Sequence, residues 1–437
     1  MHDSPDTSFL NSINSQLGSC SLDQVEAAIR FGDHDVLGQF QGLNLFSHFQ
    51  PILSLAHRRP VGYEALLRAT TVPEKNTVPP LQVFGLARNE EDKVFLDRLC
   101  RTLHLRSFLS LGDDTSWLFL NINPQVTVHG KRYGAFFAKL LERYRMPAHR
   151  IVVEILEASI QEESLLADAV NYYKELGCLI AIDDFGAGHS NFDRIWRLAP
   201  QIVKLDRVII SQAANNQKAR RILPTLVSLI QESGSLSLIE GIETERDALI
   251  AADSGVDFVQ GYYFGRPEKS LPVGDPGSCI ILGLCEQYKR FAEIESKEYH
   301  RELQSYVDKL QQSAKLLEEG APAGRACLDL LDQPRTERCY VLNREGKQLG
   351  ANLPAPHCRI ANDPRFNPLA DAKDAVWSRR PYFRRATNNP GVVQVSRPYL
   401  SITGATMCVT LSIMVNTSQG AQVLCSDLDW NGNDPKS

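Results

Sequence analysis

Short apolar runs alternate with longer amphipathic segments over the first two thirds of the chain. From His48 onward, most of these runs end in a charged or amide side chain, and a segment with apolar residues at three-and-four spacing usually follows. The first pattern is typical of buried strands and the second of surface helices. We predict strands at 49–53, 62–67, 117–122, 151–155, 179–183, 202–205, 236–239 and 257–259.

The segments between these strands fit helices that cover a sheet. We predict helices at 91–111, 133–145, 161–176, 218–232 and 244–252. Regular alternation of strands and helices indicates a parallel (β/α)8 barrel, also called a TIM barrel, in the α/β class. The link between the first two strands, 56–60, is too short for a helical crossover. We therefore expect a modified barrel with one antiparallel strand.

The two ends of the chain differ from this repeating pattern. We expect a polar tail and a padding helix within 1–40, opened by a capping box at Ser21 to Gln24, and the barrel domain at 41–275. A connecting helix is predicted at 279–319. A small α+β domain on an antiparallel sheet is predicted at 326–430, where apolar and polar residues alternate.

The connecting helix carries apolar residues near three-and-four spacing. Two interpretations are open: a short coiled coil between two chains, or a helix that packs on its own domain. The residues concerned are Tyr299, Leu303, Tyr306, Leu310 and Leu317.

Composition narrows the class of protein. Apolar residues make up 43% of the 437 residues and charged residues 23%, which is ordinary for a soluble globular protein. The net charge of −5 gives no reason to expect DNA as a partner. We see no apolar run near the roughly 20 residues of a membrane span and no signal peptide, so we expect a cytoplasmic protein without membrane insertion. Ten cysteines without a CxxC pair favour reduced thiols.

Polar side chains stand at the carboxyl ends of six consecutive predicted strands. Taken singly, each has an ordinary structural explanation, and an isolated Asp183-Asp184 pair reads more readily as a turn that caps a helix. Together they deliver oxygen ligands and one lysine to the rim where parallel barrels place their sites. The set is Glu64, Asn121, Glu154, Asp183 with Asp184, Lys204, and Glu240.

Oxygen ligands favour Mg²⁺ or Mn²⁺ over zinc. Two such ions that share a carboxylate are a standard arrangement for activating water against a phosphodiester. Lys204 could orient that water or accept its proton; the structural alternative is a salt bridge to an aspartate.

The motifs in 48–267 resemble the EAL-domain family of cyclic di-GMP phosphodiesterases. They include Glu64-Ala65-Leu66, the Asn-x-x-Pro run at Asn121, and Asp183-Asp184-Phe185-Gly186. They continue with Lys204 before Leu205-Asp206, Glu240-Gly241-Ile242-Glu243 and Gln260-Gly261-Tyr262. The resemblance implies a modified TIM barrel that hydrolyses cyclic di-GMP to linear pGpG with two divalent ions.

The resemblance also implies a role for each matching residue. Glu64, Asn121, Glu154 and Asp183 would hold the first metal, and Asp183 and Asp184 the second. Lys204, Glu240 and Glu64 would be catalytic, while Gln50, Arg68 and Gln260 would contact the substrate. Glu157 would brace the loop after Asp184, and Glu243 would support the site. The chain departs from the family pattern at His189, Asn191 and Ile239, and it has no GGDEF motif.

The C-terminal segment resembles PAS-like or Cache-like sensory domains. The matching runs are Trp377 to Phe383, 391–396, 398–401 and 408–412. Two interpretations are open: a sensor for an unknown small molecule, or a dimerisation module whose aromatic residues are core. The pocket candidates are Arg379, Arg380, Tyr382 and Tyr399.

The sequence thus favours a metal-dependent phosphodiesterase that is regulated by its C-terminal domain and forms a homodimer through the barrel and that domain. One alternative is a receptor that binds cyclic di-GMP without hydrolysing it. Another is an unrelated barrel enzyme with oxygen ligands, such as an enolase-type lyase, which would not need the Asn-x-x-Pro or Gln-Gly-Tyr elements.

Overall fold

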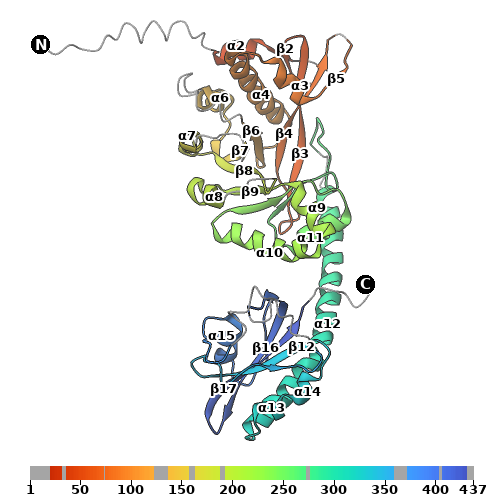
Figure 1. Cartoon of the computed structure of the whole chain (residues 1–437). Coiled ribbons are helices and arrows are strands. Elements are labelled where there is room, and N and C mark those ends of the chain that lie inside the picture. Colours follow the sequence, from red (N-terminus) through yellow and green to blue (C-terminus); the bar gives the residue numbers. More distant parts are fainter. Residues whose placement is uncertain are drawn as a thin grey trace, which may run out of the picture. The chain divides into compact units, whose positions relative to one another are not determined.

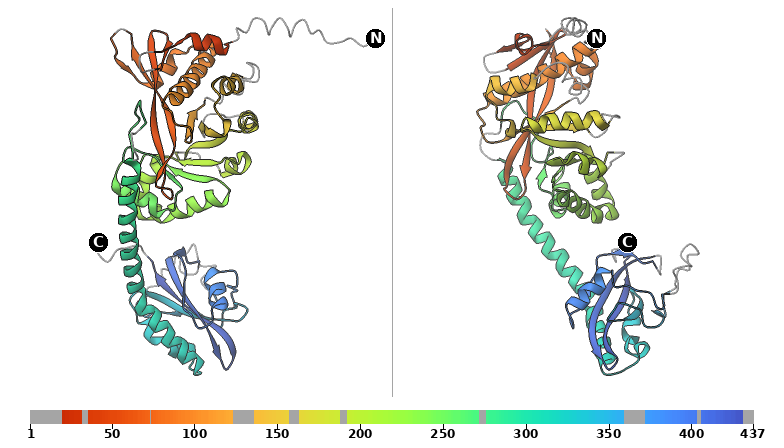
Figure 2. Two further views of the ribbon diagram at one scale, coloured as in Figure 1. Left: turned by 180° about the vertical axis from the view of Figure 1, so that it is seen from behind. Right: turned by 90° about the vertical axis from the view of Figure 1, so that its left-hand side faces the viewer.

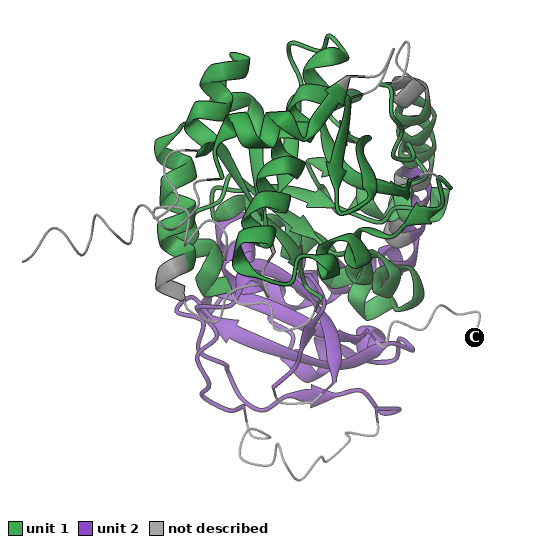
Figure 3. Cartoon of the chain, turned by 90° about the horizontal axis from the view of Figure 1, so that it is seen from above, with its two compact units in different colours: residues 1–290 green, residues 291–437 purple. Residues whose placement is uncertain are grey.

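The computed structural model (Figure 1) describes residues 20–31, 36–72, 74–122, 136–156, 163–187, 192–271, 276–358, 372–402 and 406–430. The chain divides into two compact units, Met1–Arg290 and Phe291–Ser437 (Figure 3). Helix α12 (Pro276–Glu318) runs through the boundary between them.

The first unit contains a closed eight-stranded barrel. Strand β3 pairs antiparallel with both β4 and β11, and all other neighbours in the barrel are parallel. All eight predicted strands and the single antiparallel strand are therefore confirmed. The strands are β3 (Leu43–Ser54), β4 (Arg59–Thr71), β6 (Trp117–Asn121), β7 (Ile151–Leu156), β8 (Leu179–Phe185), β9 (Ile202–Leu205), β10 (Leu236–Ile239) and β11 (Phe258–Val259).

Buried apolar side chains from the barrel strands pack together in one layer. Seven strands each contribute one buried residue to this layer, as expected when alternate side chains of every strand share a face. Strand β4 carries Gly62 beside it, because a Cβ there would lie only 2.7 Å from a ring carbon of Phe119. The seven residues are Ile52, Phe119, Val152, Ala181, Ile202, Leu238 and Phe258.

Helices pack outside the strands (Figures 1 and 2). The predicted helices are confirmed where the structure describes them, and three short helices, α3, α8 and α9, were missed. The confirmed helices are α4 (Glu90–Ser110), α6 (Phe136–Tyr144), α7 (Glu163–Glu175), α10 (Gln217–Glu232) and α11 (Glu245–Asp253). The missed ones are α3 (Pro80–Leu86), α8 (Phe192–Leu198) and α9 (Arg207–Asn215).

The N-terminal part adds strands that the sequence did not reveal. The predicted capping box is present, since the Ser21 side chain accepts from Gln24 N and the Gln24 side chain accepts from Ser21 N. The helix that it opens is α2 (Leu22–Ala27), and the chain continues after it almost directly into β1 (Ile29–Phe31). Strands β1, β2 (Val36–Phe40) and β5 (Thr77–Val78) extend the sheet along β3 and β4. The predicted tail, 1–19, lies outside the described residues.

The second unit is an α+β domain on a six-stranded antiparallel sheet, as predicted from its alternating pattern. Its membership of the PAS or Cache class stays a prediction. The strands are β12 (Thr336–Asn343), β13 (Leu353–Pro354), β14 (Gln394–Val395), β15 (Tyr399–Leu400), β16 (Met407–Thr417) and β17 (Gly420–Asp429). The helices are α13 (Ala323–Ala326), α14 (Leu328–Leu331) and α15 (Pro381–Asn388).

The C-terminal half of α12 packs on this sheet. Its apolar stripe is buried together with side chains of α14, β12, β16 and β17, so the helix lies on its own domain and the stripe is not a free coiled-coil seam. The side chain of Tyr299 lies outside the described residues. Although α12 has 43 residues, neither it nor any other helix within the described ranges is apolar enough to cross a membrane. The buried stripe comprises Leu303, Tyr306, Leu310, Ala314 and Leu317.

Candidate active site

The polar residues predicted at strand ends gather at one rim of the barrel. Because β4 and β6 to β11 run parallel, their carboxyl ends meet there. Asn121 and Glu154 are direct partners across the β6–β7 pair, and Glu64 lies one strand further along in β4. Lys204 is in β9, and Glu240 follows β10 directly.

Lys204 is the centre of this cluster. Its side chain is 1% exposed, and its Nζ lies 2.5 Å from Glu240 Oε1, 3.2 Å from Asp183 Oδ1 and 3.9 Å from Glu64 Oε2. Glu154 Oε1 is also in direct contact with the ammonium group. Four carboxylates, three within β4, β7 and β8 and one directly after β10, therefore surround one buried cation.

Side-chain amides hold Glu64 in place. Asn121 Nδ2 donates to Glu64 Oε1 at 2.8 Å, and Gln260 Nε2 donates to Glu64 Oε2 at 2.7 Å. The same Gln260 nitrogen lies 3.3 Å from Gln50 Oε1, and Gln50 Nε2 donates to Gly265 O at 3.1 Å. Gln50, Asn121 and Gln260, predicted separately from three strands, thus belong to one hydrogen-bond network around Glu64.

The end of β8 brings two consecutive aspartates to the same place. Side chains of successive strand residues normally point to opposite faces. Asp184 departs from this rule because its backbone is left-handed, with φ of 59°, and its N–H donates to Asp183 Oδ1 at 3.0 Å. Carboxylate oxygens of Asp183, Asp184 and Glu240 consequently lie within 4.8 Å of one another.

Asp206 is a neighbour that the sequence reasoning did not assign to the site. Its side chain caps helix α9 by accepting from Val208 N at 2.7 Å. Burial, then Asp183, then Asp206 raise the pKa of Asp184 above its ordinary value. The signal that could have revealed Asp206 is an aspartate at the junction of a buried strand and a helix.

The electrostatics of the cluster favour a bound divalent cation. Burial raises the pKa of Glu240 to about 8, although Lys204 opposes this shift. Burial and the nearby Glu64 raise the pKa of Glu154 well above its usual range. Burial alone would lower the pKa of Lys204, but Asp183, Glu154 and Glu240 outweigh it and raise the pKa. The ammonium group therefore stays charged among a surplus of carboxylates.

The donor set fits a hard metal ion. Five carboxylates, those of the four partners of Lys204 together with Asp184, lie in the cluster beside that single ammonium group. Glu154 Oε2 has no hydrogen-bond partner within the described part of the chain, and Glu154 Oε1 contacts the Lys204 ammonium group. Buried carboxylates without donors are costly unless a cation compensates them. Such an all-oxygen set matches Mg²⁺ or Mn²⁺.

The remaining predicted site residues differ in how buried they are, and some lie outside the described residues. Arg68 is half-buried, its Nη1 donates to Leu67 O at 2.9 Å, and it forms no ion pair with any described residue. Glu243 is exposed, and its predicted role stays a prediction. Glu157, His189 and Asn191 lie outside the described residues. Ile239 is fully buried in β10.

A glycine directly after Glu240 shapes the rim. Gly241 has φ of 66°, and a Cβ at this position would lie 2.2 Å from Arg207 Cβ at the start of α9. A side chain at position 241 would fit only if the turn after β10 or the start of α9 moved. Glycine therefore allows the chain to turn closely past α9 while Glu240 stays beside Lys204.

Several known proteins share this sequence pattern. The EAL-domain containing protein YkuI of Bacillus subtilis is 25% identical over 351 residues, which are 78% of this chain and 83% of YkuI. The probable cyclic di-GMP phosphodiesterase PdeN of Escherichia coli is 30% identical over 235 residues, 52% of this chain and 43% of PdeN. The cyclic di-GMP phosphodiesterase RocR of Pseudomonas aeruginosa is 26% identical over 249 residues, 56% of this chain and 62% of RocR.

The fold is shared with a solved structure. The crystal structure of Bacillus subtilis YkuI, which has an EAL domain and contains c-di-GMP and calcium, matches with a TM-score of 0.74 at 24% identity. The match covers 89% of this chain and 96% of that chain. Residues 34–267, more than half of this chain, match the family described as EAL domain. The family predicted from the motifs is therefore confirmed, and the chain belongs to the EAL domain family.

Proposed function

We propose that this protein is a metal-dependent phosphodiesterase that hydrolyses cyclic di-GMP to linear pGpG. The observation that carries the proposal is the ring of four carboxylates around the buried Lys204, with Asp184 beside it. The names of two relatives support the same substrate: PdeN is a probable cyclic di-GMP phosphodiesterase, and RocR is a cyclic di-GMP phosphodiesterase.

The proposed metal ligands come from neighbouring strands. Glu64, Asn121, Glu154 and Asp183 would hold one Mg²⁺ or Mn²⁺ ion, and Asp183 would share a second ion with Asp184. When bound, such ions neutralise the phosphate and make a water molecule a better nucleophile.

Lys204 and Glu240 have complementary proton chemistry. Because its carboxylate neighbours raise the pKa of Lys204, the side chain remains an ammonium group that can donate a hydrogen bond to the attacking water and hold it in line. Glu240 lies 2.5 Å from that ammonium group, so its ionised carboxylate would be placed to accept the proton that the water loses.

The substrate would enter beside the carboxylate cluster. Arg68, which is free of ion pairs among the described residues, would bind a phosphate oxygen through charge-assisted hydrogen bonds. Gln50 and Gln260 would contact the dinucleotide, while Glu157 and Glu243 would support the loop and the site. Residues 41–275 would form the catalytic domain of a cytoplasmic homodimer. The 279–319 helix and the 326–430 domain would regulate it.

The test is turnover by the purified full chain with cyclic di-GMP and Mn²⁺, with pGpG quantified by chromatography. We expect Lys204→Gln and Glu64→Gln each to lower the rate by at least about 10²-fold, because each removes a group in contact with the reacting centre. Lys218→Gln, at an exposed position of α10, is the matched control and should leave the rate unchanged.

Three outcomes separate the candidate functions. Production of pGpG that depends on Lys204 supports the hydrolase. Binding of cyclic di-GMP without any pGpG would identify a receptor. Absence of binding would point to an unrelated barrel enzyme, such as a lyase. Activity within a few-fold of wild type in Lys204→Gln would show that the site is misassigned.

A further inference from the structure

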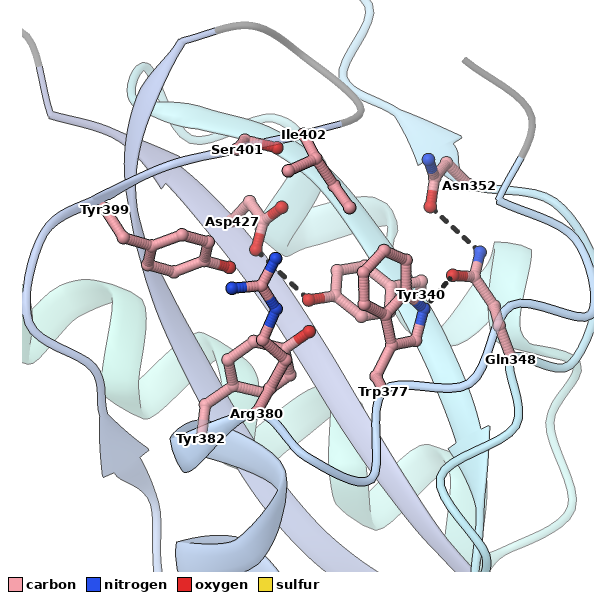
Figure 4. A pocket seen from close by; sticks show the side chains of 10 residues that line it. All are labelled: Tyr340, Gln348, Asn352, Trp377, Arg380, Tyr382, Tyr399, Ser401, Ile402 and Asp427. Carbon is pink, nitrogen blue, oxygen red and sulfur yellow. Dashed lines mark hydrogen bonds between the residues drawn. The ribbon is translucent and has the colours of Figure 1, made fainter. Parts of the chain in front are cut away.

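The second unit contains a pocket that lies apart from the barrel chemistry (Figure 4). It has about 280 Å³ of space, including the part open to solvent, and aromatic side chains form much of its wall. Three of the four pocket candidates predicted from the sequence line it, whereas Arg379 is exposed outside it. The lining residues are Tyr340, Gln348, Asn352, Trp377, Arg380, Tyr382, Tyr399, Ser401, Ile402 and Asp427.

Arg380 places a positive charge among these rings. Its guanidinium carbon lies 6.0 Å from the ring centre of Trp377 and 5.6 Å from that of Tyr399. It forms no ion pair or side-chain hydrogen bond with any residue that the structure describes. A half-buried guanidinium without a carboxylate keeps five N–H donors for an external acceptor.

The buried acid of the pocket already has its partners. Asp427 is 3% exposed; its Oδ2 accepts from Arg338 Nε at 2.9 Å. Its Oδ1 accepts from Thr410 Oγ1 at 2.7 Å and from Tyr340 OH at 3.3 Å. An acid so compensated does not need a cationic ligand, and Arg380 is left as the charged group that does need a partner.

The walls of the pocket are fixed in position. The rings of Tyr382 and Tyr399 stack with centres 6.2 Å apart, and Tyr399 OH lies 2.6 Å from Thr410 Oγ1. Trp377 Nε1 donates to Gln348 Oε1 at 3.0 Å, and Gln348 Nε2 donates to Asn352 Oδ1 at 2.9 Å. Figure 4 shows these last two hydrogen bonds along one side of the pocket. Flat, held aromatic walls suit a small planar or apolar body.

We propose that this pocket binds a small organic monocarboxylate, with the carboxylate on Arg380 and a compact planar or apolar body between the aromatic rings. The planar guanidinium fork matches the two oxygens of a carboxylate. A single guanidinium balances the one negative charge of a carboxylate, whereas the second charge of a phosphate dianion would find no further cation among the lining residues. Because Asp427 is compensated, the ammonium group of an amino acid would find no unpaired acid.

The test uses the full chain and benzoate as the probe, with binding measured by calorimetry. Benzamide has the same shape without the charge, so it should bind at least about tenfold more weakly. Arg380→Gln should weaken benzoate binding by at least about tenfold. Arg379→Gln, which removes the exposed neighbouring arginine, should leave the affinity within about twofold.

A second variant distinguishes loss of the binding group from loss of the fold. Arg380→Lys keeps the charge but not the planar fork, so it should bind benzoate more weakly than wild type and more tightly than Arg380→Gln. Circular dichroism would check that both variants are folded. The proposal is overturned if wild type does not bind benzoate, if Arg380→Gln and Arg379→Gln bind it equally well, or if inorganic phosphate or alanine binds more tightly than benzoate.

Discussion

His104 is a histidine that the folded protein keeps neutral. It lies on α4, is 7% exposed, and its Nδ1 is 2.8 Å from Ser47 Oγ. Burial, reinforced by Arg68, lowers the pKa of His104 to about 4. The unfolded chain binds a proton on this residue near pH 6.5 and the folded chain only near pH 4, so stability is lost as pH falls between these values. The loss amounts to about 3 kcal/mol.

Thermal unfolding between pH 7 and pH 4 tests this prediction. His104→Gln cannot bind the proton, so its stability relative to wild type should improve by about 3 kcal/mol over that range. His357→Gln, at an exposed position, should show no such change. A constant difference between His104→Gln and wild type at all pH values would mean that His104 is protonated in the folded state as easily as in the unfolded chain.

At the residue scale, the sequence predicted which side chains reach the rim but not how they share charge. Glu64, Glu154 and Lys204 could be placed because each lies in or at the end of a strand whose direction the alternation fixed. The left-handed backbone of Asp184 and the contribution of Asp206 depend on the path of the chain after β8 and β9, which hydrophobic periodicity does not encode.

The turn after β10 shows how one element positions Glu240, the proposed proton acceptor. Gly241 and Gly255 both have positive φ, 66° and 75°, but only at Gly241 would a Cβ meet another atom, Arg207 Cβ at 2.2 Å. Each Gly→Ala substitution should cost about 1 kcal/mol through the backbone. We expect only Gly241→Ala to shift Glu240 from Lys204 and to lower turnover, by at least about tenfold.

Rates of pGpG formation and midpoints of urea unfolding for the two variants separate these effects. Gly255→Ala should lose stability while it keeps its activity. Equal activity in both variants would show that the close approach of Gly241 to α9 does not hold Glu240 in place.

Helix α12 gives a second prediction at the scale of one structural element. Leu310 is fully buried against the sheet of its own domain, whereas Leu316 is 42% exposed. Leu310→Ala should destabilise the second unit by about 2–5 kcal/mol, and Leu316→Ala by less than about 0.5 kcal/mol. Thermal unfolding combined with light scattering tests this. A change of oligomeric mass on Leu310→Ala without a loss of stability would favour the coiled coil instead.

Element length accounts for most of the helices that the sequence revealed or missed. Long amphipathic segments such as α4 and α10 were found, because several turns repeat the same pattern. Helices α3 and α8 have seven residues each, too few turns for a periodic signal. Helix α9 has nine residues, as many as α6 and α11, which were predicted, so length alone does not explain why it was missed. Strand β1 has three residues and begins two residues after the end of α2, so its sequence reads as a continuation of that helix.

At the scale of the whole molecule, the barrel core and the carboxylate rim place opposite demands on stability. The apolar layers stabilise the fold, whereas the rim buries charges that repel one another in the metal-free protein. The raised pKa of Glu154 means that its ionised form costs stability at neutral pH, because the unfolded chain ionises this group more easily. Such a cost is expected where function requires a cation site.

Glu154→Gln should therefore stabilise the protein without metal and abolish its response to metal. In wild type, Mn²⁺ at about 100 times its dissociation constant should raise the stability by about 2.7 kcal/mol. The variant should melt at a higher temperature than wild type in EDTA and gain little from Mn²⁺, since a ligand is lost. Glu175→Gln, at an exposed position of α7, should behave as wild type in both conditions. A lower melting temperature of Glu154→Gln in EDTA would instead show that its contact with Lys204 outweighs the cost of burying the charge, and an undiminished Mn²⁺ response would exclude Glu154 as a ligand.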